Sequence, residues 1–248
     1  MSYTLDGITL ETKRTPSGVG YLQYGADNLP TIVYLHGIGE RGDGSEWSLP
    51  SLLGQGPMCR NWTNGGFTAW MYKEVFSLGF RILYPQLPTS KSAWDIAYID
   101  SFLDAVHTNQ PLFLCGWSLG GGGALRYAAQ ATKKHNLTCF AGFASYIAPT
   151  TGENVTSPYF FAHSTNDGTV NVSHTDNYVS KIPNFNPSQY KRGTSGDHWY
   201  YLIDGFNTRP IYDWFKSFTV EITYTPGSIE LGSDGLVYGN FNGQRKLI

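Results

Sequence analysis

The segment Gly116-Trp117-Ser118-Leu119-Gly120 constrains the fold of this chain more than any other segment. It follows the apolar run 111–115, which has the length of a buried strand, and precedes the Ala-rich run 121–129, which is typical of a helix. A serine at a sharp strand-to-helix turn, with glycine on both sides, has a strained backbone that lifts its hydroxyl clear of the sheet. The free N–H groups at the start of the helix face incoming negative charge. Ser118 is therefore the candidate nucleophile.

A second buried-strand run, 31–35, ends in His36-Gly37-Ile38-Gly39-Glu40-Arg41-Gly42. When a serine attacks a carbonyl group, the tetrahedral intermediate carries an oxyanion that needs two preorganised N–H donors. We expect one donor from the residue after the nucleophile, Leu119, and the other from Ile38, in the loop that follows this earlier strand. His36 is expected to be a structural hydrogen-bonding residue.

A nucleophilic serine needs a base, and the base needs an orienting carboxylate. In folds that carry the serine on this kind of strand-to-helix turn, the chain order is Ser, then Asp or Glu, then His. His198 lies in a polar, glycine-containing loop downstream of Ser118 and is the expected base. The other histidines fit this order or loop context less well; they are His36, His107, His135, His163 and His174.

The expected acid is Asp167, which follows the strand-like run 157–163, because α/β sheets gather functional groups at the carboxyl ends of their strands. Asp176 is interpreted as a solvated charge on the next helix. Asp197 is adjacent to His198 but is expected to point elsewhere on an extended loop.

These segments resemble the α/β-hydrolase superfamily, in its carboxylesterase, phospholipase and dienelactone-hydrolase-like branch, over roughly residues 19–218. The string 36–42 resembles the oxyanion loop of feruloyl-esterase-like families. The resemblance implies a triad of Ser118, Asp167 and His198, the Ile38 and Leu119 donors, and a bracing role for the pair Glu40-Arg41. The glycine run 120–123 is similar instead to the elbow of polyester hydrolases and cutinases, whose oxyanion loop lacks the Glu-Arg-Gly feature.

Alternating strand and helix patterns predict an α/β fold, namely the α/β-hydrolase fold with a mostly parallel twisted sheet and helices on both faces. We expect strands near 7–10, 20–24, 31–35, 81–84, 139–143, 159–162 and 189–192, besides the strand before Ser118. We expect helices near 67–78, 93–107, 170–182 and 209–218, besides the helix from Leu119.

The expected hydrolase domain covers 1–218, and residues 219–248 are expected to form a short β-hairpin-like C-terminal appendage. Its strand-like segments 219–224, 228–231 and 236–238 are separated by turn signals such as Pro226-Gly227 and Asn242-Gly243. About thirty residues cannot bury a core alone. We therefore expect them to pack on the hydrolase domain, on a second copy in a homo-oligomer, or on a further domain.

Residues 43–66 form a long polar, glycine-rich insertion directly after the oxyanion loop, and loops of this length are often functional. Two interpretations stay open for its large side chains, Trp47, Met58 and Trp62. They line a substrate pocket, to which Trp117 also contributes, or they pack the loop onto the domain.

Composition excludes several classes of protein. The 248 residues are 41% hydrophobic and 15% charged, which excludes a disordered chain, and the net charge of −2 gives no electrostatic case for nucleic acid or anionic membranes. No run of about 18 apolar residues suggests a membrane span, and no secretory signal is visible. The expected location is the cytoplasm, although a mature secreted chain would look similar apart from its initial Met.

The three cysteines suit a reduced compartment, with Cys115 and Cys139 expected in the core and Cys59 in a loop. No His, Cys or Asp spacing resembles a zinc site, so we expect neither a metal nor a cofactor.

The sequence thus predicts a serine hydrolase that cleaves small or medium acyl esters through an acyl-enzyme, with a small-molecule ester as its partner. Alternatives are a feruloyl or acetyl esterase acting on polysaccharide, a polyester hydrolase, and a serine peptidase or thioesterase. A different class, a non-catalytic binding protein on a hydrolase fold, is disfavoured because the chain retains all three triad residues.

Overall fold

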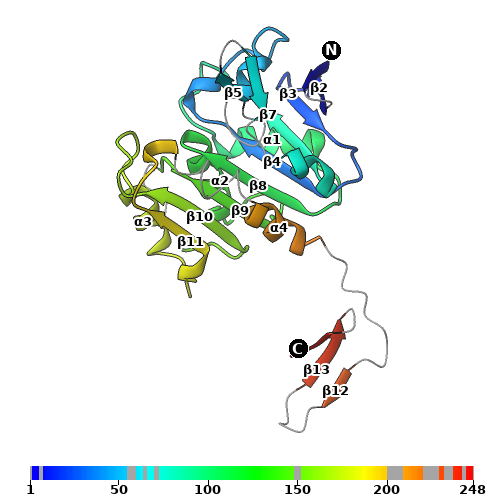
Figure 1. Ribbon diagram of the computed structural model, residues 1–248, viewed down its shortest axis with the longest axis vertical. Helices are drawn as coiled ribbons and strands as arrows, with labels where there is room; N and C mark the ends of the chain where they lie inside the picture. Colours follow the sequence, from blue (N-terminus) through cyan, green and yellow to red (C-terminus); the bar gives the residue numbers. More distant parts are fainter. Residues whose placement is uncertain are drawn as a thin grey trace.

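The structure is a computed structural model that describes residues 2–5, 8–54, 60–63, 66–69, 73–147, 152–199, 209–219, 229–231, 237–241 and 244–247. Within these ranges a nine-stranded sheet forms the centre of the molecule (Figure 1). Its strands, in order across the sheet, are β1 (Ser2–Leu5), β2 (Ile8–Arg14), β3 (Gly20–Tyr24), β7 (Arg81–Pro85), β4 (Thr31–Leu35), β8 (Leu112–Trp117), β9 (Cys139–Phe143), β10 (Tyr159–Ser164) and β11 (Tyr190–Gly193). The strands from β1 to β7 pair antiparallel, and those from β7 to β11 pair parallel. The predicted mostly parallel α/β sheet is confirmed.

The central strands are buried along their whole length, which explains their unbroken apolar sequences. Every residue of β4, β8 and β9 is buried, the pattern expected where helices cover both faces of a parallel sheet. Alternate side chains of one strand then enter opposite cores. In β4, Ile32 and Tyr34 pack in one core, and Val33 and Leu35 pack in the other.

Helices cover both faces, as predicted. Side chains of α1 (Ile96–Val106), α2 (Leu119–Ala129) and α3 (Ser173–Val179) pack in the core of Val33 and Leu35. Side chains of α4 (Arg209–Ser217) and of the 3₁₀ segment η2 (Leu49–Gly54) pack in the core of Ile32 and Tyr34. Cys115 and Cys139 are buried and free, as expected, whereas Cys59 lies outside the described residues.

The parallel strands bring distant loops to one edge of the sheet, because their carboxyl ends point the same way. β4 leads into η1 (Ile38–Glu40), and β8 leads through Ser118 into α2. β10 leads into the loop of Asp167, and β11 leads toward η6 (Asp197–Trp199). The sequence-predicted site residues therefore converge by topology.

The predicted helix 67–78 is wrong in its first half. The structure has a hairpin of β5 (Arg60–Thr63) and β6 (Gly66–Ala69), followed by the 3₁₀ segment η4 (Lys73–Leu78). The register pairs Thr63 with Gly66, which leaves two residues between the strands. Those two are Asn64-Gly65, the strongest short hairpin signal, and it outweighs the apolar periodicity that suggested a helix.

The C-terminal segment contains β12 (Ile229–Leu231), β13 (Val237–Phe241) and β14 (Gln244–Leu247), which pair antiparallel in a separate three-stranded sheet (Figure 1). The predicted strand 219–224 falls almost entirely outside the described residues. The domain boundary at 218 and the role of the appendage in packing or homo-oligomer contacts stay predictions. Across the described ranges, no helix combines the length and the apolar character needed to cross a membrane.

Candidate active site

Ser118 occupies the strained turn between β8 and α2. Its backbone φ of 55° and ψ of −119° lie in a region that side chains other than glycine rarely adopt. The Ser118 N–H donates to the Phe143 carbonyl at 2.9 Å, and the Ser118 carbonyl accepts from the N–H groups of Tyr146 at 2.9 Å and Gly122 at 3.1 Å. These hydrogen bonds hold the turn in a conformation that it would not adopt alone.

The glycines around Ser118 are required because three backbone segments meet there. A Cβ atom on Gly120 would lie 1.8 Å from the carbonyl oxygen of Leu35, at the end of β4. A Cβ atom on Gly116 would lie 2.4 Å from the carbonyl carbon of Gly120. Close packing of α2 on the sheet therefore explains the glycine run, without any need for a polyester-hydrolase relationship.

Ser118, His198 and Asp167 form one hydrogen-bonded chain, although 31 and 80 residues separate the partners in sequence. His198 Nε2 lies 3.0 Å from Ser118 Oγ, and His198 Nδ1 lies 2.7 Å from Asp167 Oδ2. All three residues are buried. Because the carboxylate accepts the Nδ1–H, Nε2 is left to accept the serine proton.

Asp167 is itself fixed by the start of the following loop. Its Oδ1 atom accepts hydrogen bonds from the N–H groups of Thr169 at 2.8 Å and Val170 at 2.7 Å. The second oxygen, Oδ2, is thereby directed at the imidazole of His198.

The rival carboxylates take structural positions. Asp197 has a φ of 52°, and its side chain accepts from the Gly168 N–H at 2.8 Å, so it links the loop of His198 to the loop of Asp167. Asp176, on α3, accepts from the Tyr190 hydroxyl at 2.9 Å and forms an ion pair with Arg192 at 3.0 Å. Neither carboxylate is paired with the His198 ring in the way that Asp167 is.

Ile38 and Leu119 each begin a helical segment, η1 and α2 respectively. N–H groups in the first turn of a helix have no acceptor within that helix. The Ile38 side chain is 57% exposed at this edge of the sheet. Arg41 braces the loop, since its Nε donates to the Ile38 carbonyl at 3.1 Å and its guanidinium donates to the Lys91 carbonyl at 2.9 Å.

Beneath the same loop, His36 is a structural residue, as expected. Its buried ring donates from Nδ1 to the Gly37 carbonyl at 2.6 Å and accepts the Leu87 N–H at Nε2, 2.9 Å away. Burial lowers the pKa of His36 to about 4, so the ring is neutral near pH 7. The carboxyl oxygen Oε2 of Glu40 lies 3.8 Å from His36 Nδ1, and burial raises the pKa of Glu40 to about 7.

The four candidate pocket residues differ in burial and in how far the structure describes them. Trp117 is only 4% exposed, and its indole donates to the His198 carbonyl and packs against the His198 ring, which favours support of His198 over contact with a substrate. Trp47 is 93% exposed. The backbone of Trp62 lies on β5, but its side chain is not described, and Met58 lies outside the described residues. A pocket formed by these residues stays a prediction.

Two residues near the site escaped the sequence interpretation. Tyr146, whose N–H binds the Ser118 carbonyl, has a side chain 45% exposed, with its ring packed 5.2 Å from that of His174. His163, dismissed as a base because it precedes the acid, lies 3.2 Å from Asp167 Oδ2. The available signal was position in the chain, since Tyr146 follows β9 by three residues and His163 is the last residue but one of β10.

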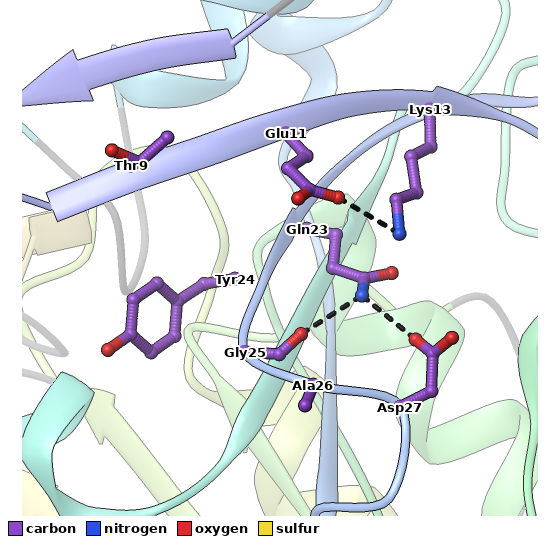
Figure 2. A pocket seen from close by; sticks show the side chains of 8 residues that line it. All are labelled: Thr9, Glu11, Lys13, Gln23, Tyr24, Gly25, Ala26 and Asp27. Atoms are coloured by element: carbon purple, nitrogen blue, oxygen red, sulfur yellow. Dashed lines mark hydrogen bonds and ion pairs between the residues drawn. The ribbon is translucent and has the colours of Figure 1, made fainter.

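A separate pocket of about 570 Å³ lies beside β2 and β3 (Figure 2). Its polar side chains pair with one another, as in Glu11 with Lys13 at 3.0 Å and Gln23 with Asp27 at 2.9 Å (Figure 2). Tyr24 pairs in register with the start of β7, so the pocket lies at the edge of the sheet opposite Ser118. Among the described residues that line it there is no serine, cysteine or histidine, and it adds nothing to the site.

At the level of sequence, no protein-family model and no curated protein matches this chain. Solved structures do match. A thermostable esterase shares 17% identity with a TM-score of 0.50, over 87% of this chain and 61% of the esterase. An esterase from Pyrococcus furiosus shares 11% with a TM-score of 0.53, over 85% and 92% of the two chains. A serine hydrolase involved in carbazole degradation shares 10% with a TM-score of 0.54, over 84% and 98%.

At such low identities the likeness shows the fold alone. The chain has the α/β-hydrolase fold, as the resemblance of its motifs implied. It spans about three-fifths of the length of the thermostable esterase, since it covers 61% of that protein.

Proposed function

We propose that this chain is a serine hydrolase that cleaves carboxylic esters through an acyl-enzyme. The observation that carries the proposal is the buried hydrogen-bonded chain from Ser118 Oγ through His198 to Asp167, with links of 3.0 Å and 2.7 Å. A serine hydroxyl is a weak nucleophile until a positioned base removes its proton, and this chain supplies the base and its orienting carboxylate.

The proposed reaction has two halves. In the first, Ser118 Oγ attacks the ester carbonyl carbon while its proton passes to His198 Nε2. The Ile38 and Leu119 N–H groups hold the resulting oxyanion, and Asp167 stabilises the imidazolium. Collapse of the intermediate breaks the ester C–O bond, and the leaving alkoxide takes the proton from His198.

In the second half, His198 deprotonates a water molecule that attacks the acyl group on Ser118. The bond between the acyl carbon and Ser118 Oγ then breaks, His198 returns the proton to Oγ, and the acid product leaves. Apart from the ester and the water molecule, each step uses only groups that the chain itself provides.

A small or medium acyl ester is the proposed substrate. The side chains of Ile38 and Tyr146 are 57% and 45% exposed. Each residue belongs to a loop whose backbone contacts the turn at Ser118. Large apolar side chains left open to solvent commonly mark a binding surface. Two of the structural neighbours are described as esterases, which supports the same class.

A panel of p-nitrophenyl esters of increasing acyl length, beside methyl ferulate and a polyester film, tests the substrate class. We expect turnover to be highest for short or medium acyl chains. Preference for ferulate or for the film would instead support those alternatives. An absence of turnover on every ester by the folded protein would favour a binding protein.

The matched control is Ser118→Ala, which removes one oxygen and leaves no cavity. We expect kcat/KM to fall on the order of 10³-fold or more, with an unchanged circular dichroism spectrum. A folded Ser118→Ala variant with near-normal ester turnover would refute the proposal.

A further inference from the structure

His163 is a fully buried histidine that the proposed reaction does not use as a base. It lies near the end of β10, four residues before Asp167. Its Nδ1 atom lies 2.8 Å from Thr175 Oγ1, and its Nε2 atom lies 2.9 Å from the Val170 carbonyl oxygen and 3.2 Å from Asp167 Oδ2. Both ring nitrogens therefore have polar partners in a site closed to solvent.

The partners fix which nitrogen carries the proton. A backbone carbonyl only accepts hydrogen bonds, so Nε2 must be the donor toward Val170. Nδ1 then accepts the hydroxyl proton of Thr175, which is also buried. Burial lowers the pKa of His163, so that the ring is neutral at neutral pH and has a single N–H to donate.

The nitrogen that carries this N–H lies close to a carboxylate oxygen of Asp167. The Nε2 atom that donates to the Val170 carbonyl also lies 3.2 Å from Asp167 Oδ2, the same oxygen that accepts from His198 Nδ1 at 2.7 Å. Asp167 thus receives two backbone N–H groups on Oδ1 and the His198 Nδ1–H on Oδ2, and His163 Nε2 is the second imidazole nitrogen within 3.2 Å of Oδ2. The titratable groups that face His163 are Asp167 and His198.

We propose that His163 is a positioning residue for the reaction: its Nε2–H holds Asp167 Oδ2 in place against His198 and withdraws part of the negative charge on that oxygen. The inference rests on the proposed function. His163 acts through Asp167 and touches no substrate, so it affects kcat and the pH profile and leaves KM unchanged.

Loss of this donor has two consequences with definite signs. A carboxylate that is free to shift orients His198 less well, and misplacement on the order of 1 Å costs up to about 10²-fold in rate. The negative charge on Oδ2 is also less delocalised, so it stabilises the imidazolium more strongly. The acid limb of the kcat/KM profile then moves to higher pH, by about half a unit if one ordinary hydrogen bond is lost.

Two substitutions of His163 test the donor directly. His163→Phe keeps a ring and removes the N–H, and we expect kcat to fall by about 10- to 100-fold, KM to stay within about twofold, and the acid limb to move up. His163→Gln places an amide N–H near the position of Nε2, and we expect it to restore most of kcat and the wild-type limb.

The matched control is Thr175→Val, a substitution of similar shape in the same buried cluster. It removes the donor to Nδ1 but keeps the Nε2–H toward Asp167. We expect it to lower the melting temperature with little change in kcat or in the pH limb. A folded His163→Phe variant that behaves like Thr175→Val, losing stability alone, would overturn the proposal.

A measurement on the wild-type protein needs no variant to fold. ¹⁵N NMR of histidine-labelled protein at neutral pH reports which ring nitrogen of His163 carries the proton. We expect the Nε2–H tautomer, and the Nδ1–H tautomer would overturn the proposal. Failure of the proposed function is a separate result, because it appears as absent ester turnover in the wild type or undiminished turnover in Ser118→Ala.

Discussion

The indole N–H of Trp117 donates to the backbone carbonyl of His198 at 3.0 Å, and the two rings pack with their centroids 4.8 Å apart. The residue that precedes the proposed nucleophile therefore holds the residue proposed as its base. This contact joins the end of β8 to η6, and 81 residues separate Trp117 from His198 in the sequence.

Trp117→Phe should keep the aromatic packing and lose the hydrogen bond. We expect kcat to fall by about tenfold with KM unchanged, because the loop of His198 becomes less well fixed. The melting temperature should fall by about 2–4 °C, the equivalent of about 1 kcal/mol. Steady-state kinetics and a thermal melt check both values, and an unchanged kcat would show that the loop needs no support from Trp117.

Asp167→Asn should keep the fold and reduce kcat strongly, on the order of 10⁴-fold, because an amide does not stabilise the imidazolium and favours the wrong tautomer of His198. Asp197→Asn should be mild, since an amide oxygen still accepts from the Gly168 N–H and asparagine tolerates a positive φ. Both variants are compared in one ester assay. If Asp197→Asn is the more damaging, Asp167 is not the acid.

The elements that the sequence predicted well are those whose signal is local. The run 31–35 and the run 139–143 match β4 and β9 residue for residue, because strands buried on both faces need unbroken apolar sequence. The turn at Ser118 was also predictable from local sequence, because two flanking glycines and a following helix lie within a few residues of one another.

The features that the sequence did not predict depend on contacts between distant segments. The chain order Ser, Asp, His excludes His163 as the base, but it says nothing of a ring that packs against the acid from β10. The positive φ of Asp197 and the position of Trp117 behind His198 follow from how two loops meet, which no local pattern reports.

Glu40→Gln should change how stability depends on pH. Burial raises the pKa of Glu40 from its usual 4.5 to about 7, so between these values the folded chain binds more protons than the unfolded chain. The free energy of unfolding therefore falls as pH rises through this window, by about 3 kcal/mol at most. His36 acts oppositely, since its lowered pKa makes stability fall as pH drops from 6.5 toward 4.

Glutamine at position 40 removes the first effect and keeps the second. The melting temperature of Glu40→Gln minus that of wild type should rise between pH 5 and pH 8. Glu11→Gln, at a side chain that is 59% exposed, is the matched control and should change the difference far less, because solvent screens an exposed charge. A flat difference for Glu40→Gln would contradict the assignment of a buried, protonated carboxyl in the loop that follows β4.

Gly120→Ala should prevent normal folding or cost at least about 3 kcal/mol, because its Cβ would lie 1.8 Å from a backbone oxygen of β4 that cannot move aside. Gly39→Ala is the control, since a Cβ there meets no heavy atom of the described residues within 4 Å. Urea unfolding of both variants measures the difference. Equal midpoints would show that α2 does not pack on β4 as closely as described.

The central claim is that Ser118 is a nucleophile activated by His198 and Asp167, and covalent labelling tests it most directly. Wild-type protein treated with a fluorophosphonate should gain the mass of one adduct, and peptide mapping should place that adduct on Ser118. Ser118→Ala should gain none, and Asp167→Asn should react far more slowly. A folded wild-type protein that gains no adduct, or that carries it on another residue, would contradict the account.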